Sequence, residues 1–237
     1  MKLYDECLTG VAELLLKYPV KRLNITDSPV WQDVGKNQII FQNDTAFELG
    51  GGTLPALSSI ALTDSEELVP CDEVLLIGDD LPDLTEDSPF ARIAMLRVDE
   101  NEMGSGDALY QAIRKIEYTR YHLNPEGYMM RISAFTHREV ARISKSGLKK
   151  GLDFSKVGRL FIEKYKEQKQ VRAVRLLFVT APDFPYDRLG EIMEKSEKIT
   201  KALDHLMKNV KMDCHSCSLK DVCEEVEALH DKDFPDK

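Results

Sequence analysis

The spacing of hydrophobic residues along the chain predicts several helices. Between residues 5 and 18, Leu8, Val11 and Leu15 recur at the spacing of one helical face, and Pro19 ends the pattern. Similar spacing recurs from residue 107 onward, where Asp107 is a predicted N-cap. The further predicted helices cover residues 107–121, 154–169, 186–210 and 224–230.

Short runs rich in β-branched and aromatic residues predict strands between these helices. The predicted strands cover residues 20–25, 38–42, 45–49, 73–78, 90–98, 127–135, 139–144 and 171–180. They do not alternate strictly with helices, which disfavours a doubly wound α/β fold. We therefore predict an α+β fold, in which a mixed sheet packed with helices occupies residues 1–185 and a helical arm occupies residues 186–237.

Composition and charge limit the classes of function. Hydrophobic residues make up 43% of the 237 residues, and the formal net charge of −9 disfavours broad nucleic-acid binding. The first residues are charged and do not resemble a signal peptide, and no apolar stretch approaches the length of a membrane span. We therefore expect a cytoplasmic protein that binds neither nucleic acid nor membranes.

The charge is unevenly distributed along the chain. Basic residues outnumber acidic ones between Arg131 and Arg175, whereas acidic residues dominate from Asp64 to Glu102 and after Asp213. A basic region within an acidic protein could hold an anionic ligand or an acidic partner. The alternative is a solvated helix face with no ligand.

Three cysteines cluster near the end of the chain, in the run M-D-C-H-S-C-S-L-K-D-V-C that contains Cys214, Cys217 and Cys223. A C-x2-C pair brings two sulfurs to one ion through a tight turn, and the third thiol supplies another ligand. In a reducing compartment this spacing is more typical of a metal site than of a disulfide framework. We predict that these thiols hold a metal; the alternative is a set of reduced or disulfide-bonded cysteines.

The run lacks a fourth ligand. Candidates to complete a 4Fe–4S cluster are Cys71, Cys7 and His230, or a cysteine of a second chain, and an open iron would allow Lewis-acid chemistry. A zinc site would instead use His215 or His230 and would pin the tail to the domain for partner binding. The thiolate-only spacing favours the cluster over zinc.

The remaining histidines are interpreted as surface or capping residues: His122, His137 and His205.

A segment in the middle of the chain resembles a known family. Arg142-Ile143-Ser144-Lys145, followed by Lys150-Gly151, Phe154 and Val157-Gly158, is similar to a segment written R-I-S-K-x4-K-G-x2-F-x2-[IV]-G. That segment belongs to acetyl-CoA synthase, the β subunit of the carbon monoxide dehydrogenase/acetyl-CoA synthase complex of anaerobes. The match combines several residue types in the correct order.

The flanking segments extend the resemblance over residues 40–223. Phe47-Glu48-Leu49-Gly50-Gly51 is similar to the family's V-E-F-G-G, and Leu76-Ile77-Gly78 resembles its strand ending L-I-G-P-D. In the family a long helix leads to a C-x2-C pair that ligates the active-site cluster, and Cys214 and Cys217 match those two positions. The resemblance implies the family's middle domain followed by the start of its cluster domain.

The resemblance implies a 4Fe–4S protein of anaerobic one-carbon and acetyl-CoA metabolism, and any enzymatic role would be that of a related transferase. The chain departs from the family at Cys223, because the family's third cysteine lies farther from the C-x2-C pair. It also contains no fourth cluster cysteine and no C-G-C pair for a distal nickel. Nickel and full synthase activity are therefore not expected of this chain alone. Expected partners are a second copy, one-carbon pathway proteins, or a coenzyme A-like ligand on the basic region.

Overall fold

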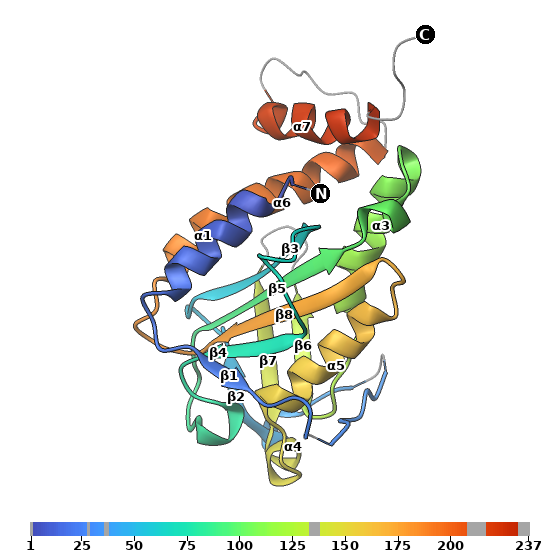
Figure 1. Cartoon of the computed structure of the whole chain (residues 1–237). Coiled ribbons are helices and arrows are strands. Elements are labelled where there is room, and N and C mark those ends of the chain that lie inside the picture. The colour runs from blue at the N-terminus through green and yellow to red at the C-terminus, as the bar shows by residue number, and fades with distance from the viewer. Residues whose placement is uncertain (1, 28, 36–37, 133–137, 208–216, 232–237) are drawn as a thin grey trace.

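The computed structural model describes residues 2–27, 29–35, 38–132, 138–207 and 217–231, which form two β-sheets with helices packed around them (Figure 1). The larger sheet contains β1 (Lys21–Leu23), β3 (Ala56–Thr63), β4 (Glu73–Ile77), β5 (Phe90–Val98) and β8 (Val171–Val179). Its strand order is β1-β4-β8-β5-β3. The sheet is mixed, because β4 runs parallel to β8 and β3 parallel to β5, whereas β5 is antiparallel to β8 and β1 to β4.

The smaller sheet contains β2 (Thr45–Leu49), β6 (Tyr128–Ile132) and β7 (Glu139–Ser144). Its central strand, β7, pairs antiparallel with both neighbours. It packs against the larger sheet through contacts of β7 with β3 and β5. Both sheets therefore share one core.

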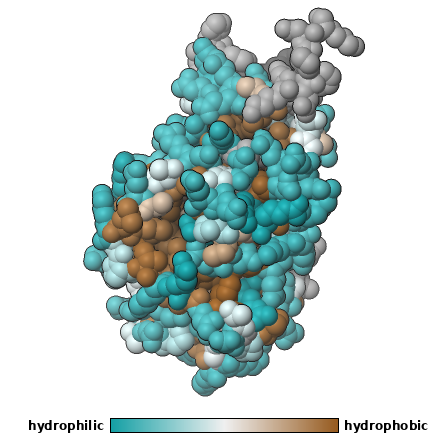
Figure 2. Space-filling model, in the orientation of Figure 1, coloured by the Kyte–Doolittle hydropathy of each residue, from teal (hydrophilic) through white to brown (hydrophobic). Residues whose placement is uncertain are grey.

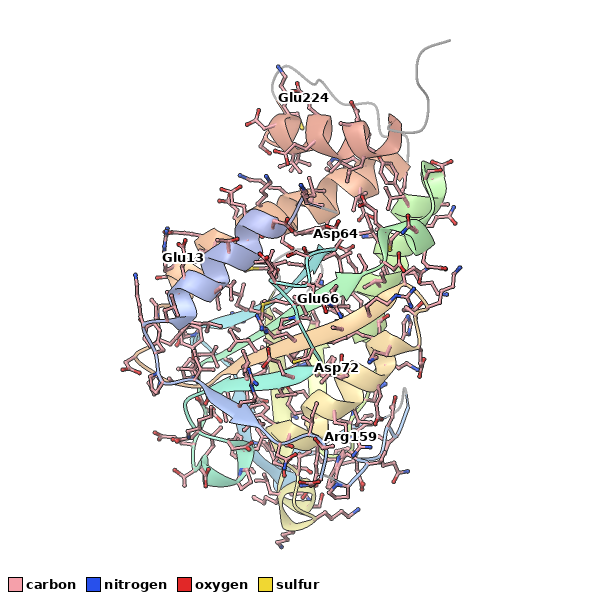
Figure 3. The ribbon with its side chains drawn as sticks, viewed as in Figure 1. Glu13, Asp64, Glu66, Asp72, Arg159 and Glu224 are labelled. Carbon is pink, nitrogen blue, oxygen red and sulfur yellow. The ribbon has the colours of Figure 1, made fainter. Side chains whose placement is uncertain are left out.

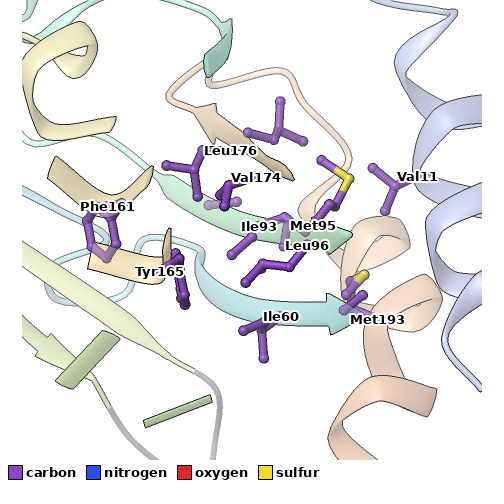
Figure 4. Packing of buried hydrophobic residues seen from close by; sticks show 14 of the residues in the cluster. Val11, Ile60, Ile93, Met95, Leu96, Phe161, Tyr165, Val174, Leu176 and Met193 are labelled. Atoms are coloured by element: carbon purple, nitrogen blue, oxygen red, sulfur yellow. The ribbon is translucent and has the colours of Figure 1, made fainter. Parts of the chain in front are cut away.

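Helices cover both faces of the larger sheet. They are α1 (Asp5–Leu15), α2 (Glu100–Met103), α3 (Asp107–Tyr118), α4 (Lys145–Lys149), α5 (Phe154–Lys166), α6 (Tyr186–Met207) and α7 (Lys220–Asp231), with 3-10 helices η1 (Gln42–Asp44), η2 (Leu81–Asp83) and η3 (Thr119–His122). α1 and α6 pack on β3, and α5 packs on β4 and β8. Figure 4 shows the two sides, with Phe161 and Tyr165 of α5 on one and Val11 and Met193 on the other.

An ion pair without solvent contact joins the two sheets. Arg92 of β5 donates from Nε to both carboxylate oxygens of Glu139 on β7, at 3.1 and 3.0 Å, and both side chains are fully buried. Arg92 Nη2 also donates to Ser58 Oγ at 3.1 Å, and the guanidinium lies over the Phe161 ring, 4.3 Å from its centroid. A buried charge pair needs such additional partners to offset its desolvation.

The predicted α+β architecture with a mixed sheet is confirmed, with two differences in its strands. No strand forms over residues 38–42, and η1 begins at the end of that segment instead. β3 was not among the predicted strands, because Ser58 and Ser59 interrupt its hydrophobic pattern. Both serines are buried and bonded, Ser58 to Arg92 and Ser59 to Ser196 of α6.

α6 is part of the body of the protein, because its buried residues belong to the same hydrophobic cluster as the sheet. α7 forms a further layer on α6, at the upper end of the view (Figure 1). The division of the chain at residue 185 stays a prediction.

Among the described residues, no helix combines the length and the apolar character that crossing a membrane requires.

The face shown in Figure 2 is hydrophilic over much of its area, with hydrophobic side chains gathered on the left of the view and in smaller areas elsewhere. The chain following α1 exposes hydrophobic residues, since 87% of Leu16 and 37% of Val20 are accessible to solvent.

Candidate functional site

The cysteine motif leads into α7, which is held firmly on α6 and α3. Three hydrophobic side chains of this region, Leu219, Val222 and Val226, are each at most 7% exposed. The hydroxyl of Tyr110 on α3 donates to the carbonyl oxygen of Val226 at 2.9 Å. α7 therefore packs on the body of the protein through its own apolar face and this hydrogen bond.

A lysine of α6 links the three helices at this end of the molecule. Lys195 Nζ lies 3.0 Å from Glu225 on α7 and 3.5 Å from Glu6 on α1. Burial by itself would lower the pKa of Lys195, but the hydrogen bond and charge of Glu225 raise it above its ordinary value. The lysine is therefore charged at neutral pH and helps to align α7 with α1 and α6.

Two of the three predicted metal ligands lie at the start of α7. Cys217 lies three residues before the first residue of the helix, and its carbonyl oxygen accepts a hydrogen bond from the Lys220 amide at 3.3 Å. Cys223 lies within α7, not before it as the sequence prediction of a helix over 224–230 implied, and its amide donates to the Leu219 carbonyl at 2.8 Å. Both side chains are half-buried. Cys214 lies outside the described residues, as does His215.

The described ranges contain no group of three His, Cys, Asp or Glu side chains arranged to hold a metal ion. Those ranges include Cys217 and Cys223 but not Cys214, so they contain only part of the predicted ligand set. The predicted C-terminal metal motif is therefore not shown as a formed site. The structure gives the positions of two thiols, that of Cys217 three residues before α7 and that of Cys223 in its first turn.

The predicted fourth ligand Cys7 belongs to a separate cleft. It lies on α1, only 1% exposed, at a cleft of about 690 Å³ between α1, α6 and α7. The α7 residues that line this cleft include Asp221, Val222 and Glu225, and the predicted ligand Cys217 is not among the lining residues. Burial raises the pKa of the Cys7 thiol, which disfavours the thiolate that a metal needs.

The other two predicted fourth ligands lie elsewhere on the fold. Cys71 is exposed in the loop before β4, and its neighbour Asp72 binds Lys166 of α5 at 2.6 Å. Figure 3 shows Asp72 on the body of the sheet domain, well separated from Glu224 of α7. The structure therefore does not bring Cys71 to the start of α7. His230 belongs to α7, and its side chain lies outside the described residues.

The structure brings together one pair of residues that the sequence analysis had not combined. Cys217 and His205 line the same cleft, of about 580 Å³, between α6 and the segment that leads into α7. His205 was interpreted from the sequence as a surface or capping residue. The two residues are twelve positions apart without a motif spacing, so only the chain reversal between α6 and α7 could reveal the pair.

The basic region is extensively paired within the fold. Arg142 binds Glu48 at 2.7 Å, and Arg172 binds Asp99 at 2.7 Å. Further ion pairs of this region join Lys150 to Glu126, Lys156 to Asp153, Arg159 to Glu163, Lys164 to Glu167, Lys166 to Asp72, Lys169 to Glu102 and Arg175 to Glu73. Much of the local positive charge therefore has an acidic partner without any anionic ligand.

No protein-family model matches this chain, and no curated protein matches it in sequence.

Proposed function

We propose that this protein binds a 4Fe–4S cluster through Cys214, Cys217 and Cys223 and is a relative of acetyl-CoA synthase that acts in one-carbon metabolism. The observation that carries the proposal is the position of two half-buried thiols, Cys217 three residues before α7 and Cys223 in its first turn, next to a helix that is packed on the body of the protein. Cys214, three residues before Cys217, completes the sulfur ligands from the sequence.

The local chemistry supports a negatively charged thiolate cluster. The N-terminal end of a helix presents unpaired amide groups and the positive end of its dipole, which favour negative charge. Cys217 lies three residues before this end of α7, and the cleft of about 580 Å³ that it lines lies within the size range of small ligand sites. When bound, the cluster would supply electron transfer or a Lewis-acid iron.

The alternative function is a zinc-stabilised interaction module. Zinc would use the same thiols and a histidine, and it would fasten the tail instead of supporting chemistry. The hydrogen bond from Tyr110 to Val226 and the burial of Val222 connect α7 to the body of the protein, which favours the cluster over an ion whose role is to fasten the tail. A coenzyme A-like ligand is less favoured because the basic region is extensively paired.

Anaerobic purification with metal analysis tests this proposal. We expect iron and acid-labile sulfide in the purified chain, with a broad brown absorbance that fades in air. A colourless protein with one zinc per chain would contradict the cluster and support the interaction module.

A further inference from the structure

The segment that leads into η1 holds two large hydrophobic side chains in solvent. Ile39 is 67% exposed and Phe41 is 68% exposed, whereas Ile40 between them is only 5% exposed. Phe41 has extended backbone angles, and alternate side chains of an extended segment point to the same side. Ile39 and Phe41 therefore form an exposed hydrophobic pair on one side of the chain, and Ile40 faces the protein.

Hydrogen bonds to the smaller sheet fix this orientation. The side-chain oxygen of Gln38 accepts from the Gly127 amide at 2.6 Å, and its nitrogen donates to the Tyr128 carbonyl oxygen at 3.2 Å. Arg142 Nη1 of β7 donates to the carbonyl oxygen of Ile40 at 3.1 Å. The segment is therefore attached through a polar side chain and its backbone, and its hydrophobic pair faces outward.

The segment crosses the outer face of the smaller sheet. The inner face of that sheet belongs to the core and contains Phe47, Leu49, Tyr128, Ala141 and Ile143. Because side chains alternate along a strand, the paired residues Met129 and Arg142 lie on the outer face, as do Arg131 and Val140. The Ile40 amide donates to Met129 Sδ at 3.4 Å, which places the segment on this face.

Three cations of the basic region surround this part of the surface. Arg131 of β6 and both Lys145 and Lys149 of α4 are exposed. Lys145 Nζ donates to the carbonyl oxygen of Asn43 at 3.2 Å, two residues after Phe41. Within the described ranges, none of these three cations forms an ion pair, in contrast to most of the basic region.

The carboxylates close to these cations are already bonded. Glu48 on the outer face of β2 binds Arg142 at 2.7 Å. Asp44 accepts hydrogen bonds from the amide and hydroxyl of Ser146 at 3.0 and 2.7 Å. The hydroxyl of Ser146 lowers the pKa of Asp44, and the charges of the two α4 lysines lower it further. One carboxylate faces two lysines, so positive charge is in excess beside the hydrophobic pair.

We propose that Ile39 and Phe41, with Arg131, Lys145 and Lys149 around them, form a docking surface for an acidic amphipathic segment of a protein partner. Hydrophobic side chains of that segment cover Ile39 and Phe41, and its carboxylates pair with the cations. The net charge of −9 disfavours a second copy of this chain as the occupant. α4 and α7 lie at opposite ends of the molecule (Figure 1), so this role is independent of the metal site.

The test uses the full chain and a short fluorescent peptide composed of Leu, Phe, Asp and Glu, with binding followed by anisotropy. We expect binding that weakens with salt, and at least about tenfold weaker binding of a matched peptide with Asn and Gln in place of the acids. The double variant Ile39→Ser with Phe41→Ser should bind the acidic peptide at least about tenfold more weakly. Lys145→Gln with Lys149→Gln should weaken binding and reduce its dependence on salt.

Two matched controls change the same residue types on other surfaces. Leu16→Ser removes a side chain that is 87% exposed, and Lys115→Gln removes an exposed lysine of α3. Both should leave the dissociation constant within about twofold, and circular dichroism should show that every variant is folded.

Three outcomes would overturn the docking surface for an acidic partner. The first is absence of peptide binding, or a loss in the controls equal to that in the variants. The second is binding to vesicles of phosphatidylcholine and phosphatidylserine that Ile39→Ser with Phe41→Ser abolishes, which would identify a membrane surface. The third is a dimer that the same double variant dissociates in analytical ultracentrifugation, which would identify a second copy.

Discussion

At the scale of single residues, the protein depends on a few charged groups that are removed from water. Arg92 and Glu139 are both fully buried, and each hydrogen-bonds across the junction of the two sheets. Charged groups are rarely buried in this way unless they are paired, because the desolvation of each ion costs several kcal/mol. The pair therefore fixes how the smaller sheet docks on the larger one.

Glu139→Gln should destabilise the fold by about 3–5 kcal/mol, because it leaves the Arg92 charge buried without its counter-ion. The double variant Arg92→Met with Glu139→Leu should recover most of this loss, since apolar residues of similar volume remove both desolvation costs. Urea unfolding followed by circular dichroism measures both free energies. A loss below about 1 kcal/mol for the single variant would show that the pair does not stabilise the junction of the sheets.

A second buried acid leads to a prediction about pH. Glu117 of α3 is 2% exposed, accepts a hydrogen bond from Thr200 and lies near Arg114 and Arg120. Burial raises the pKa of this carboxyl, and the Thr200 hydrogen bond and the arginines only partly oppose that effect. The folded protein therefore holds the proton more tightly than the unfolded chain does.

Folding stability should consequently fall as the pH rises from the ordinary glutamate range through the raised pKa of Glu117. Glu117→Gln is neutral at every pH and can still accept from Thr200, so its stability should lack this decline. The measurement is the difference in unfolding free energy between the two proteins across pH. A difference that is constant with pH, or that favours the unmodified protein more as pH rises, would contradict the prediction.

At the scale of elements, α7 is the part of the fold that supports the site. It contacts α6 and α3 through one hydrophobic face, and its outer face is exposed to solvent. Two predicted metal ligands, Cys217 and Cys223, depend on this helix for their position. The integrity of the metal site should therefore be separable from that of the sheet.

Val226→Asp should release α7 from the body, because it places a charge at a position that is 0% exposed. Ala228→Asp adds the same charge to the exposed face of the helix and serves as the matched control. Hydrogen exchange should show loss of protection in α7 by more than about 2 kcal/mol for Val226→Asp only. Equal protection in the two variants would mean that the hydrophobic face does not hold the helix.

Cys217→Ser should abolish metal binding and leave the sheets folded, because the thiol precedes α7 and makes no contact that the core requires. Cys71→Ser removes an exposed cysteine of the loop before β4 and should retain the metal. Metal content and circular dichroism measure the two properties separately. Global unfolding of Cys217→Ser would indicate that the ion stabilises the whole fold.

At the scale of the whole molecule, the described thiols are dispersed. Cys7 is buried on α1, Cys71 is exposed before β4, and Cys217 and Cys223 lie at α7. A nickel site of the acetyl-CoA synthase type uses two thiolates that flank a single residue, in addition to the cluster cysteines. No two cysteines of this sequence have that spacing.

We therefore expect no acetyl-CoA synthesis by this chain alone. The measurement is carbonyl exchange into acetyl-CoA, carried out under reducing conditions with added nickel. The complete synthase, assayed in parallel, is the positive control. Clear turnover with stoichiometric nickel would show that the cysteines present here suffice.

The sequence predicted those features that depend on neighbouring residues. β4, β5 and β8 are almost entirely buried, so their hydrophobic runs were recognisable without a structure. The helical spacing likewise identified α1, α5 and α6, and the spacing of Cys214, Cys217 and Cys223 suggested a metal. Each of these signals is contained in a short segment of chain.

Tertiary structure alone decided which distant residues meet. Ser58 is a polar residue in the sequence and becomes part of a buried strand because Arg92 occupies the adjacent strand and donates to it. His205 carries no motif, and it lines one cleft with Cys217 because α6 and α7 pack together. Local periodicity indicates the face of a helix or strand on which a residue lies. The partner that hydrogen-bonds a buried polar group comes from a remote segment of the chain, and only the fold brings the two together.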